Sequence, residues 1–175
     1  MVKKLTGKAG MTLVEMLASV LILVMLVVGM NAGMNAGLRV YRDSKAVTER
    51  SMLSSGINTK LTDILRYAQV KTVTVDGEEE HLITNLEYGL WDVTFEEDED
   101  GIVQVCFRDK TGKPTGKETP LINTGNYSGF AVQDLSVEPE TDDKGTYFTI
   151  RYTLVNTVDD SSTDEIHAVV RVMNE

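Results

Sequence analysis

A single carboxylate stands at the start of the longest apolar stretch of the chain. Glu15 lies within Gly10–Met30, GMTLVEMLASVLILVMLVVGM, and the 23 residues from Met16 to Leu38 carry no charge. A charged side chain in an apolar membrane segment costs roughly 2.5–3.5 kcal/mol on insertion scales. A carboxylate in such a setting is expected to have a partner or a task, so Glu15 is the first candidate for a functional residue.

The other residues that could do nucleophilic or acid–base chemistry are scattered. The sequence has one cysteine, Cys106, and two histidines, His81 and His167, none of them in a recognisable catalytic signature. Cys106 sits in the alternating run Val103–Phe107, where a small core residue is expected. The sequence contains no Gly-rich phosphate loop, Ser/His/Asp set or paired Cys/His ligands. We therefore expect no enzyme activity and no catalytic residue, and a lone cysteine allows no intramolecular disulfide.

The acidic run Glu96–Asp100, closed by Gly101, is the one pattern that could hold a metal ion. Calcium takes six to eight oxygen ligands, and Asp98 and Asp100 are the candidates, although EF-hand spacing is missing. The alternative, which we favour, is a charged hairpin tip that discourages aggregation. No other cofactor is expected, and carboxylates in such turns are expected to keep ordinary pKa values.

Charge is divided unevenly along the chain. Residues 1–70 carry nine Lys and Arg against four Asp and Glu, whereas residues 71–175 carry eight against 23. The leading lysines Lys3, Lys4 and Lys8 favour the cytoplasmic side, and the apolar stretch is long enough to span a bilayer. We expect a single-pass membrane protein with an acidic part outside the cytoplasm. Its acidity argues against direct binding to nucleic acid, which needs Lys and Arg.

The basic leader, Gly10, the segment Met11-Thr12-Leu13-Val14-Glu15 and the apolar run together resemble the class III signal of type IV pilins and type II secretion pseudopilins. The resemblance implies that residues 1–10 are a leader, removed between Gly10 and Met11 by a prepilin peptidase that also methylates Met11. Glu15 would be the fifth mature residue and match the family's glutamate in filament assembly. Met11 departs from the family's usual Phe.

The same resemblance implies the partners and the location. Besides the peptidase and the membrane, they are other pilin or pseudopilin subunits and an inner-membrane assembly platform. The product would be a filament at the cell surface or across the envelope, serving secretion, a pilus or competence, and these three share the features of the sequence.

Two further interpretations of the N-terminus remain. A secretory signal peptide would be cut after the apolar run, at Ala32-Gly33 or Ala36-Gly37, but Glu15 and the length of the run disfavour it. A single-pass anchor whose acidic head binds an extracellular ligand, without a filament, explains the length and the lysines. That interpretation leaves Glu15 unexplained.

The sequence predicts one long helix from about Thr12 to about Ala68. Residues 11–38 form its membrane or filament-core part, and residues 39–69 form an amphipathic part. Apolar residues of this second part recur at helical spacing, at Leu53, Ile57, Leu61, Ile64, Leu65 and Ala68. Gly56 is a candidate kink.

Three glycines, Gly29, Gly33 and Gly37, lie four residues apart on one face of this helix. Small residues at that spacing allow close packing of helices in a membrane. They could equally weaken the helix where it leaves the bilayer, because each glycine costs roughly 1 kcal/mol relative to alanine.

Residues 70–175 are expected to form an antiparallel β head. Six or seven short strands are predicted by alternating runs at residues 70–75, 81–83, 90–95, 102–107, 130–137, 147–154 and 166–172. Thr111–Pro120, with two glycines and two prolines, is predicted as an exposed loop. The fold class is therefore α+β, and the order of a long helix followed by a β head resembles the pilin fold, with a layout more like minor pilins and minor pseudopilins.

Overall fold

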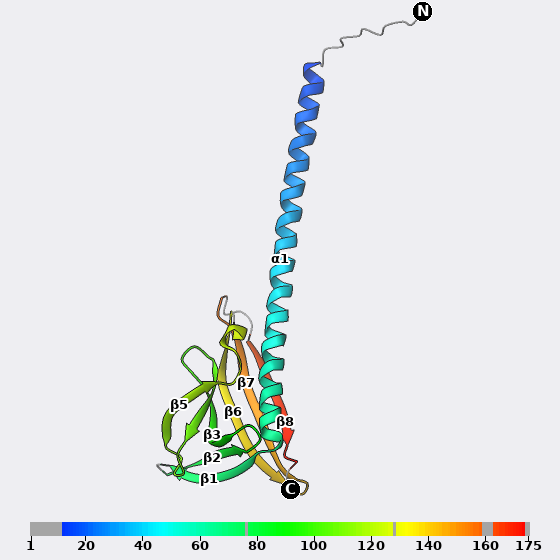
Figure 1. The fold of residues 1–175 in the computed structure, drawn as a ribbon. Coiled ribbons are helices and arrows are strands. Elements are labelled where there is room, and N and C mark those ends of the chain that lie inside the picture. Colours follow the sequence, from blue (N-terminus) through cyan, green and yellow to red (C-terminus); the bar gives the residue numbers. More distant parts are fainter. Residues whose placement is uncertain (1–11, 76, 128, 159–162, 174–175) are drawn as a thin grey trace, which may run out of the picture. The chain divides into compact units, whose positions relative to one another are not determined.

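The computed structural model describes residues 12–75, 77–127, 129–158 and 163–173. It confirms the α+β class, with one long N-terminal helix followed by an antiparallel β head (Figure 1). The elements in chain order are helix α1 (Leu13–Arg66), strands β1 (Gln69–Val75), β2 (Glu78–Asn85), β3 (Leu90–Glu97), β4 (Val103–Arg108) and β5 (Pro114–Pro120), 3-10 helix η1 (Thr124–Tyr127), and strands β6 (Phe130–Asp142), β7 (Gly145–Asn156) and β8 (Thr163–Arg171).

Helix α1 has 54 residues and contributes to two compact units, Met1–Ala46 and Val47–Glu175. Its ends agree with the predicted helix to within two residues. The kink expected at Gly56 is wrong, because the helix continues through this residue. Buried Leu53 and Ile57 hold the helix on either side of Gly56, and an added Cβ at Gly56 would lie 3.7 Å from Ile122 Cδ1. Packing therefore outweighs the weak helix propensity of glycine.

The strands of the head form two antiparallel sheets. The first has the order β1-β2-β3-β4-β5 and the second the order β6-β7-β8, with every pairing antiparallel. The predicted loop at Thr111–Pro120 is also wrong, since Pro114–Pro120 is strand β5, exposed along its whole length. Proline has no N–H to donate and is confined to sheet edges. With a proline at each end, β5 ends the first sheet, and the chain starts a second one at β6.

The core of the Val47–Glu175 unit lies between the C-terminal part of α1 and the two sheets. The helix residues predicted to form an apolar stripe are all buried, namely Leu53, Ile57, Leu61, Ile64, Leu65 and Ala68. Two buried polar side chains fix the helix to the strands. The Tyr152 hydroxyl on β7 donates to Asn58 Oδ1 at 3.1 Å, and Asn85 Nδ2 at the end of β2 donates to the Ile64 carbonyl at 2.6 Å. The register of α1 on the head is therefore set by polar contacts as well as by burial.

Candidate functional site at the start of the long helix

The first turn of α1 is closed by Thr12. The backbone N–H of Glu15 donates to Thr12 Oγ1 at 3.3 Å and to the Thr12 carbonyl at 3.0 Å. Thr12 thus acts as the N-cap and Glu15 occupies the third helical position, which is the spacing of a capping box. This role was missed from the sequence, although the pattern Thr-x-x-Glu was visible there.

The position of Glu15 in the first turn of α1 gives its carboxylate a local function that a simple membrane anchor would also use. A carboxylate in the first turn is stabilised by the helix dipole by roughly 0.3–1 kcal/mol. This is less than the roughly 2.5–3.5 kcal/mol that a charge costs in an apolar membrane segment. The helix dipole therefore explains part of the presence of Glu15, and a further partner would still lower its free energy.

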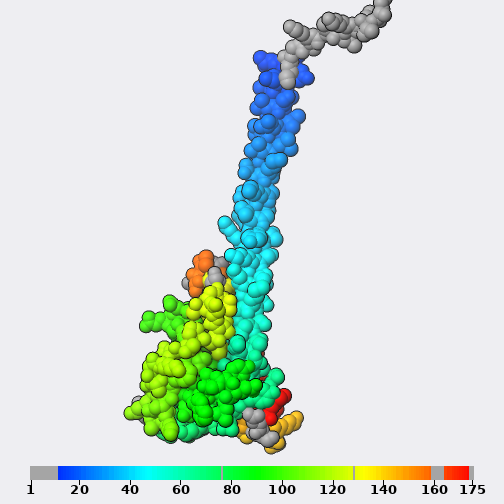
Figure 2. All heavy atoms as spheres, viewed as in Figure 1, coloured from blue at the N-terminus to red at the C-terminus, as the bar shows by residue number. Residues whose placement is uncertain are grey.

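The helix surface around Glu15 is apolar and uncovered. Leu13, Val14 and Leu17 are 77%, 73% and 62% exposed, and every residue from Thr12 to Lys45 is exposed in the chain. In Figure 2 this part of the helix presents its side chains along the whole face in view. Among the described residues, α1 is the one helix long and apolar enough to cross a membrane, by length and composition. The surface is compatible with a single-pass anchor.

Gly29, Gly33 and Gly37 lie on this exposed part of α1. A Cβ added at any of the three would meet no heavy atom within 4 Å. No described residue therefore packs against the glycine face, and the helix remains continuous across it. The loosened helix considered from the sequence is not seen, and the face stays open to a partner.

The proposed processing site is next to this turn. Gly10 and Met11, with the leader residues before them, lie outside the described residues. The structure brings Thr12 and Glu15 together, and it says nothing of the bond between Gly10 and Met11.

Cys106 is a buried core residue of β4, as expected, and is 7% exposed. Burial, together with the negative charges of Glu96 and Glu118, raises the pKa of its thiol to about 11. A thiol with so high a pKa is protonated and unreactive at neutral pH.

The acidic run ends strand β3 with Glu96 and Glu97 and continues into the turn to β4 with Asp98–Asp100, as the hairpin interpretation predicted. Asp98 Oδ1 accepts the backbone N–H groups of Asp100 at 3.0 Å and Ile102 at 2.8 Å, and Asp98 Oδ2 accepts Gln104 Nε2 at 2.8 Å. Both oxygens of Asp98 are thus used in holding the turn. Within the described part of the chain, no group of three or more His, Cys, Asp or Glu side chains is placed to hold a metal ion.

The expectation that turn carboxylates keep ordinary pKa values is wrong for Asp98, Asp109 and Asp142, and the pKa of Glu140 within β6 is lowered as well. Hydrogen bonds from Ile102, Gln104 and Asp100 hold the pKa of Asp98 below its usual value, against the opposing effect of burial. The pKa values of Asp109 and Glu140 are lowered by side-chain hydrogen bonds from Thr111 and Tyr147. Hydrogen bonds from Arg171 lower the pKa of Asp142 to about 2. These carboxylates are hydrogen-bond acceptors within the fold, which a sequence of loop residues does not reveal.

Comparison with known proteins finds no matching family model, no similar curated protein and no similar solved structure.

Proposed function

We propose that this chain is a filament subunit of the type IV pilin and pseudopilin class, assembled through the N-terminal part of α1. One observation carries the proposal: a single carboxylate, Glu15, begins a long apolar helix surface that is exposed among the residues the structure describes. Such a surface is suited to lipid before assembly and to neighbouring helices afterwards. The α+β order of a long helix and an antiparallel head supports the same class.

The proposed sequence of events starts with the leader. Lys3, Lys4 and Lys8 keep it on the cytoplasmic side, and the peptidase hydrolyses the peptide bond between Gly10 and Met11. This step releases the leader carboxylate at Gly10 and a free amine at Met11, which the same enzyme methylates. The mature helix then waits in the bilayer, anchored by its uncharged run from Met16 to Leu38.

Assembly would then supply the partner that Glu15 lacks. When the helix moves from lipid into the filament, the Glu15 carboxylate of one subunit would pair with the Met11 amine of another. Opposite charges in a medium of low dielectric attract strongly, and breaking such a buried pair costs about 3–5 kcal/mol. Loss of one partner in the filament would therefore cost more than loss of the dipole stabilisation of roughly 0.3–1 kcal/mol in the first helical turn.

The second candidate function is a membrane-anchored head that binds an extracellular ligand without forming a filament. The place of Glu15 in the first turn of α1 favours it, because stabilisation by the helix dipole gives the carboxylate a role without any partner. The two functions differ in what they demand of the side chain. Exchange for glutamine loses only the dipole stabilisation of roughly 0.3–1 kcal/mol, whereas pairing with an amine requires the negative charge.

The test is therefore the pair of variants Glu15→Gln and Glu15→Ala, expressed with the peptidase and the assembly machinery. If Glu15 pairs with the amine, both variants should be processed normally but be depleted from filaments sheared off the cells. The amount of subunit in filaments should fall by a similar factor for the two variants. Incorporation of the Glu15→Gln variant into filaments at the wild-type level would refute the pairing. Gly10→Val provides the processing control, since it should block cleavage and leave the precursor in the membrane.

A further inference from the structure

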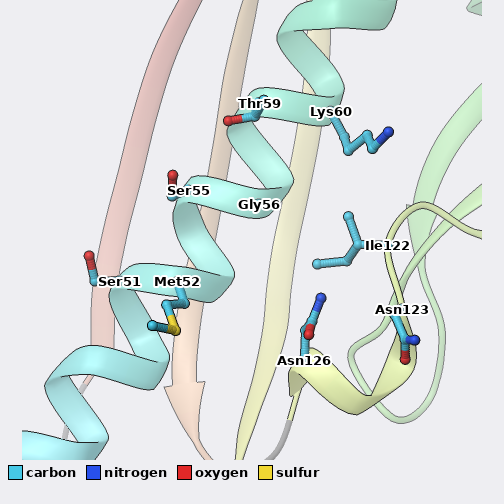
Figure 3. Close-up of a pocket in the computed structure, with 9 residues that line it drawn as sticks. All are labelled: Ser51, Met52, Ser55, Gly56, Thr59, Lys60, Ile122, Asn123 and Asn126. Atoms are coloured by element: carbon cyan, nitrogen blue, oxygen red, sulfur yellow. The ribbon is translucent and has the colours of Figure 1, made fainter.

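An open cavity of about 660 Å³ lies between α1 and the segment that joins β5 to β6 (Figure 3). Its volume is within the roughly 300–1,000 Å³ of ligand pockets. The lining residues are Ser51, Met52, Ser55, Gly56, Thr59 and Lys60 of α1, with Ile122, Asn123 and Asn126 opposite. In Figure 3, the side chain of Lys60 extends from α1 and that of Ile122 extends from the segment between β5 and β6, and both lie in the space between these two elements. We call this cavity the α1–η1 groove.

The chemistry of the groove suits an anionic occupant. Its polar side chains are hydroxyls, amides and one ammonium group, and all of them can donate hydrogen bonds. None of the nine lining residues is acidic, although the sequence has 27 Asp and Glu against 17 Lys and Arg. Lys60 forms no ion pair with any other residue that the structure describes. The groove thus carries an unpaired positive charge within a strongly acidic protein.

The same chain presents a complementary group, the turn between β3 and β4. Glu99 and Asp100 stand exposed at its apex, and neither carboxylate has a bond or an ion pair within the described ranges. The turn beneath them is fixed by the Asp98 carboxylate and by a 2.8 Å hydrogen bond from the Val132 N–H to the Gly101 carbonyl. Because the two acidic side chains are presented by a rigid turn, docking them loses little backbone entropy.

We propose that the α1–η1 groove binds the Glu99–Asp100 turn of a second copy of this chain, with Lys60 facing the two carboxylates. The inference rests on the proposed filament role, since it names a contact between consecutive subunits. Acidic heads repel one another, and a contact that places Lys60 against an acidic turn reduces this repulsion. It also requires adjacent copies of the chain, which a subunit present once at a filament tip would not have.

The two surfaces are different, so the contact is heterologous. Each copy would offer one groove and one acidic turn, and docking would leave a free turn at one end and a free groove at the other. Heterologous contacts that do not close into a ring generate open filaments. The contact would therefore extend an assembly rather than stop at a dimer.

Charge reversal tests the proposal in the full chain, with the peptidase and the assembly machinery present. Lys60→Glu alone, and Glu99→Lys with Asp100→Lys, should each lower the amount of subunit in sheared filaments at least about tenfold, because each places like charges in contact. The combined variant, with all three changes, should recover most of the loss. Lys110→Glu, at an exposed lysine in the turn between β4 and β5, is the matched control and should incorporate normally.

Folding is checked in every variant by alkylation of Cys106, which is buried in the native head. If the wild type is processed but never enters filaments, the proposed function fails. If the wild type enters filaments while the single reversals do so equally well, only the groove contact is wrong. The contact is also wrong if the combined variant folds and stays at the level of the single reversals.

Cysteine crosslinking gives a second, geometric test. Ser55→Cys lies in the groove and Glu99→Cys on the turn, so a chain with both should form disulfides between neighbours in intact filaments. Heterologous docking predicts a ladder of dimers, trimers and larger species. The proposal would be overturned if filaments containing the variant showed no crosslinks. It would also be overturned if crosslinked dimers formed without larger species.

Discussion

Gly101 and Gly116 offer a matched test of how the head is packed. Both adopt positive φ angles of nearly the same size, 72° and 73°. A Cβ at Gly101 would lie 2.5 Å from Ala131 Cβ and 2.8 Å from Val132 N, whereas a Cβ at Gly116 would meet nothing within 4 Å. Alanine at the two positions therefore carries the same backbone strain and differs in the steric clash.

The expected loss of stability can be built from these contacts. Left-handed backbone costs alanine about 1–2 kcal/mol, and the reduced entropy of the unfolded chain offsets about 0.4–1 kcal/mol of it. Gly116→Ala should thus destabilise the head by about 1 kcal/mol. At Gly101 the clash adds about 1–3 kcal/mol, and a shift of the turn would also weaken the hydrogen bond from Val132 N–H. Gly101→Ala should therefore destabilise the head by about 3–5 kcal/mol.

The assay is unfolding by urea of the full chain in detergent micelles, followed by pulse labelling of the thiol. Cys106 is the single cysteine in the sequence and is buried in β4, so its alkylation reports opening of the head without interference from the apolar helix. With a denaturant slope of about 1–3 kcal/mol/M, the midpoint of Gly101→Ala should fall at least about 1 M below that of Gly116→Ala. Equal midpoints would refute the close approach of the β3–β4 turn to β6.

Three further outcomes follow from the head. Cys106, with its pKa raised to about 11, should react slowly with iodoacetamide near neutral pH until urea unfolds the protein, and rapid labelling of the folded chain would contradict its burial. Asn85→Leu should destabilise the head by about 2–4 kcal/mol in the same urea assay, because it removes the hydrogen bond to the Ile64 carbonyl and leaves backbone groups without partners. Because the pKa of Asp142 is lowered from 3.8 to about 2, its contribution to stability is present above its unfolded pKa and lost as the pH falls towards 2. Arg171→Gln should therefore reduce the pH dependence of stability in that acid range, and an unchanged acid profile would argue against the contact with Asp142.

The sequence was sufficient to predict the helices and strands whose apolar residues recur with a clear period. The stripe from Leu53 to Ala68 repeats at helical spacing, and those residues are the buried face of α1. The strands β1, β3, β4, β6, β7 and β8 each contain an alternating run, and all six were predicted within a few residues. In these segments a single pattern of burial decides the local structure.

Elements held by contacts distant in the chain were harder to predict. Strand β5 was missed because its two prolines and Gly116 are turn-forming residues, and its strand conformation depends on pairing with β4. The division into two sheets follows from where that pairing ends. The lowered pKa values of Asp98 and Asp142 likewise depend on donors supplied by the folded turns and by Arg171 on β8.

The residues of the candidate site also differ in how far the sequence alone predicts their roles. Glu15 was found from its isolation in an apolar run, and Thr12 was overlooked although capping is a local pattern. The α1–η1 groove has no sequence signature, because Lys60 and Asn126 are 66 positions apart in the sequence and line one cavity only in the folded chain.

The most direct test of the proposed filament role is the intact mass of the chain expressed with and without a prepilin peptidase. Processing predicts loss of residues Met1 to Gly10 when the peptidase is present, with the mass of a methyl group added at Met11. An unchanged mass beside a working peptidase would instead favour the membrane anchor. A cut near Ala32 or Ala36 would favour a secreted domain, and either result would contradict the filament role.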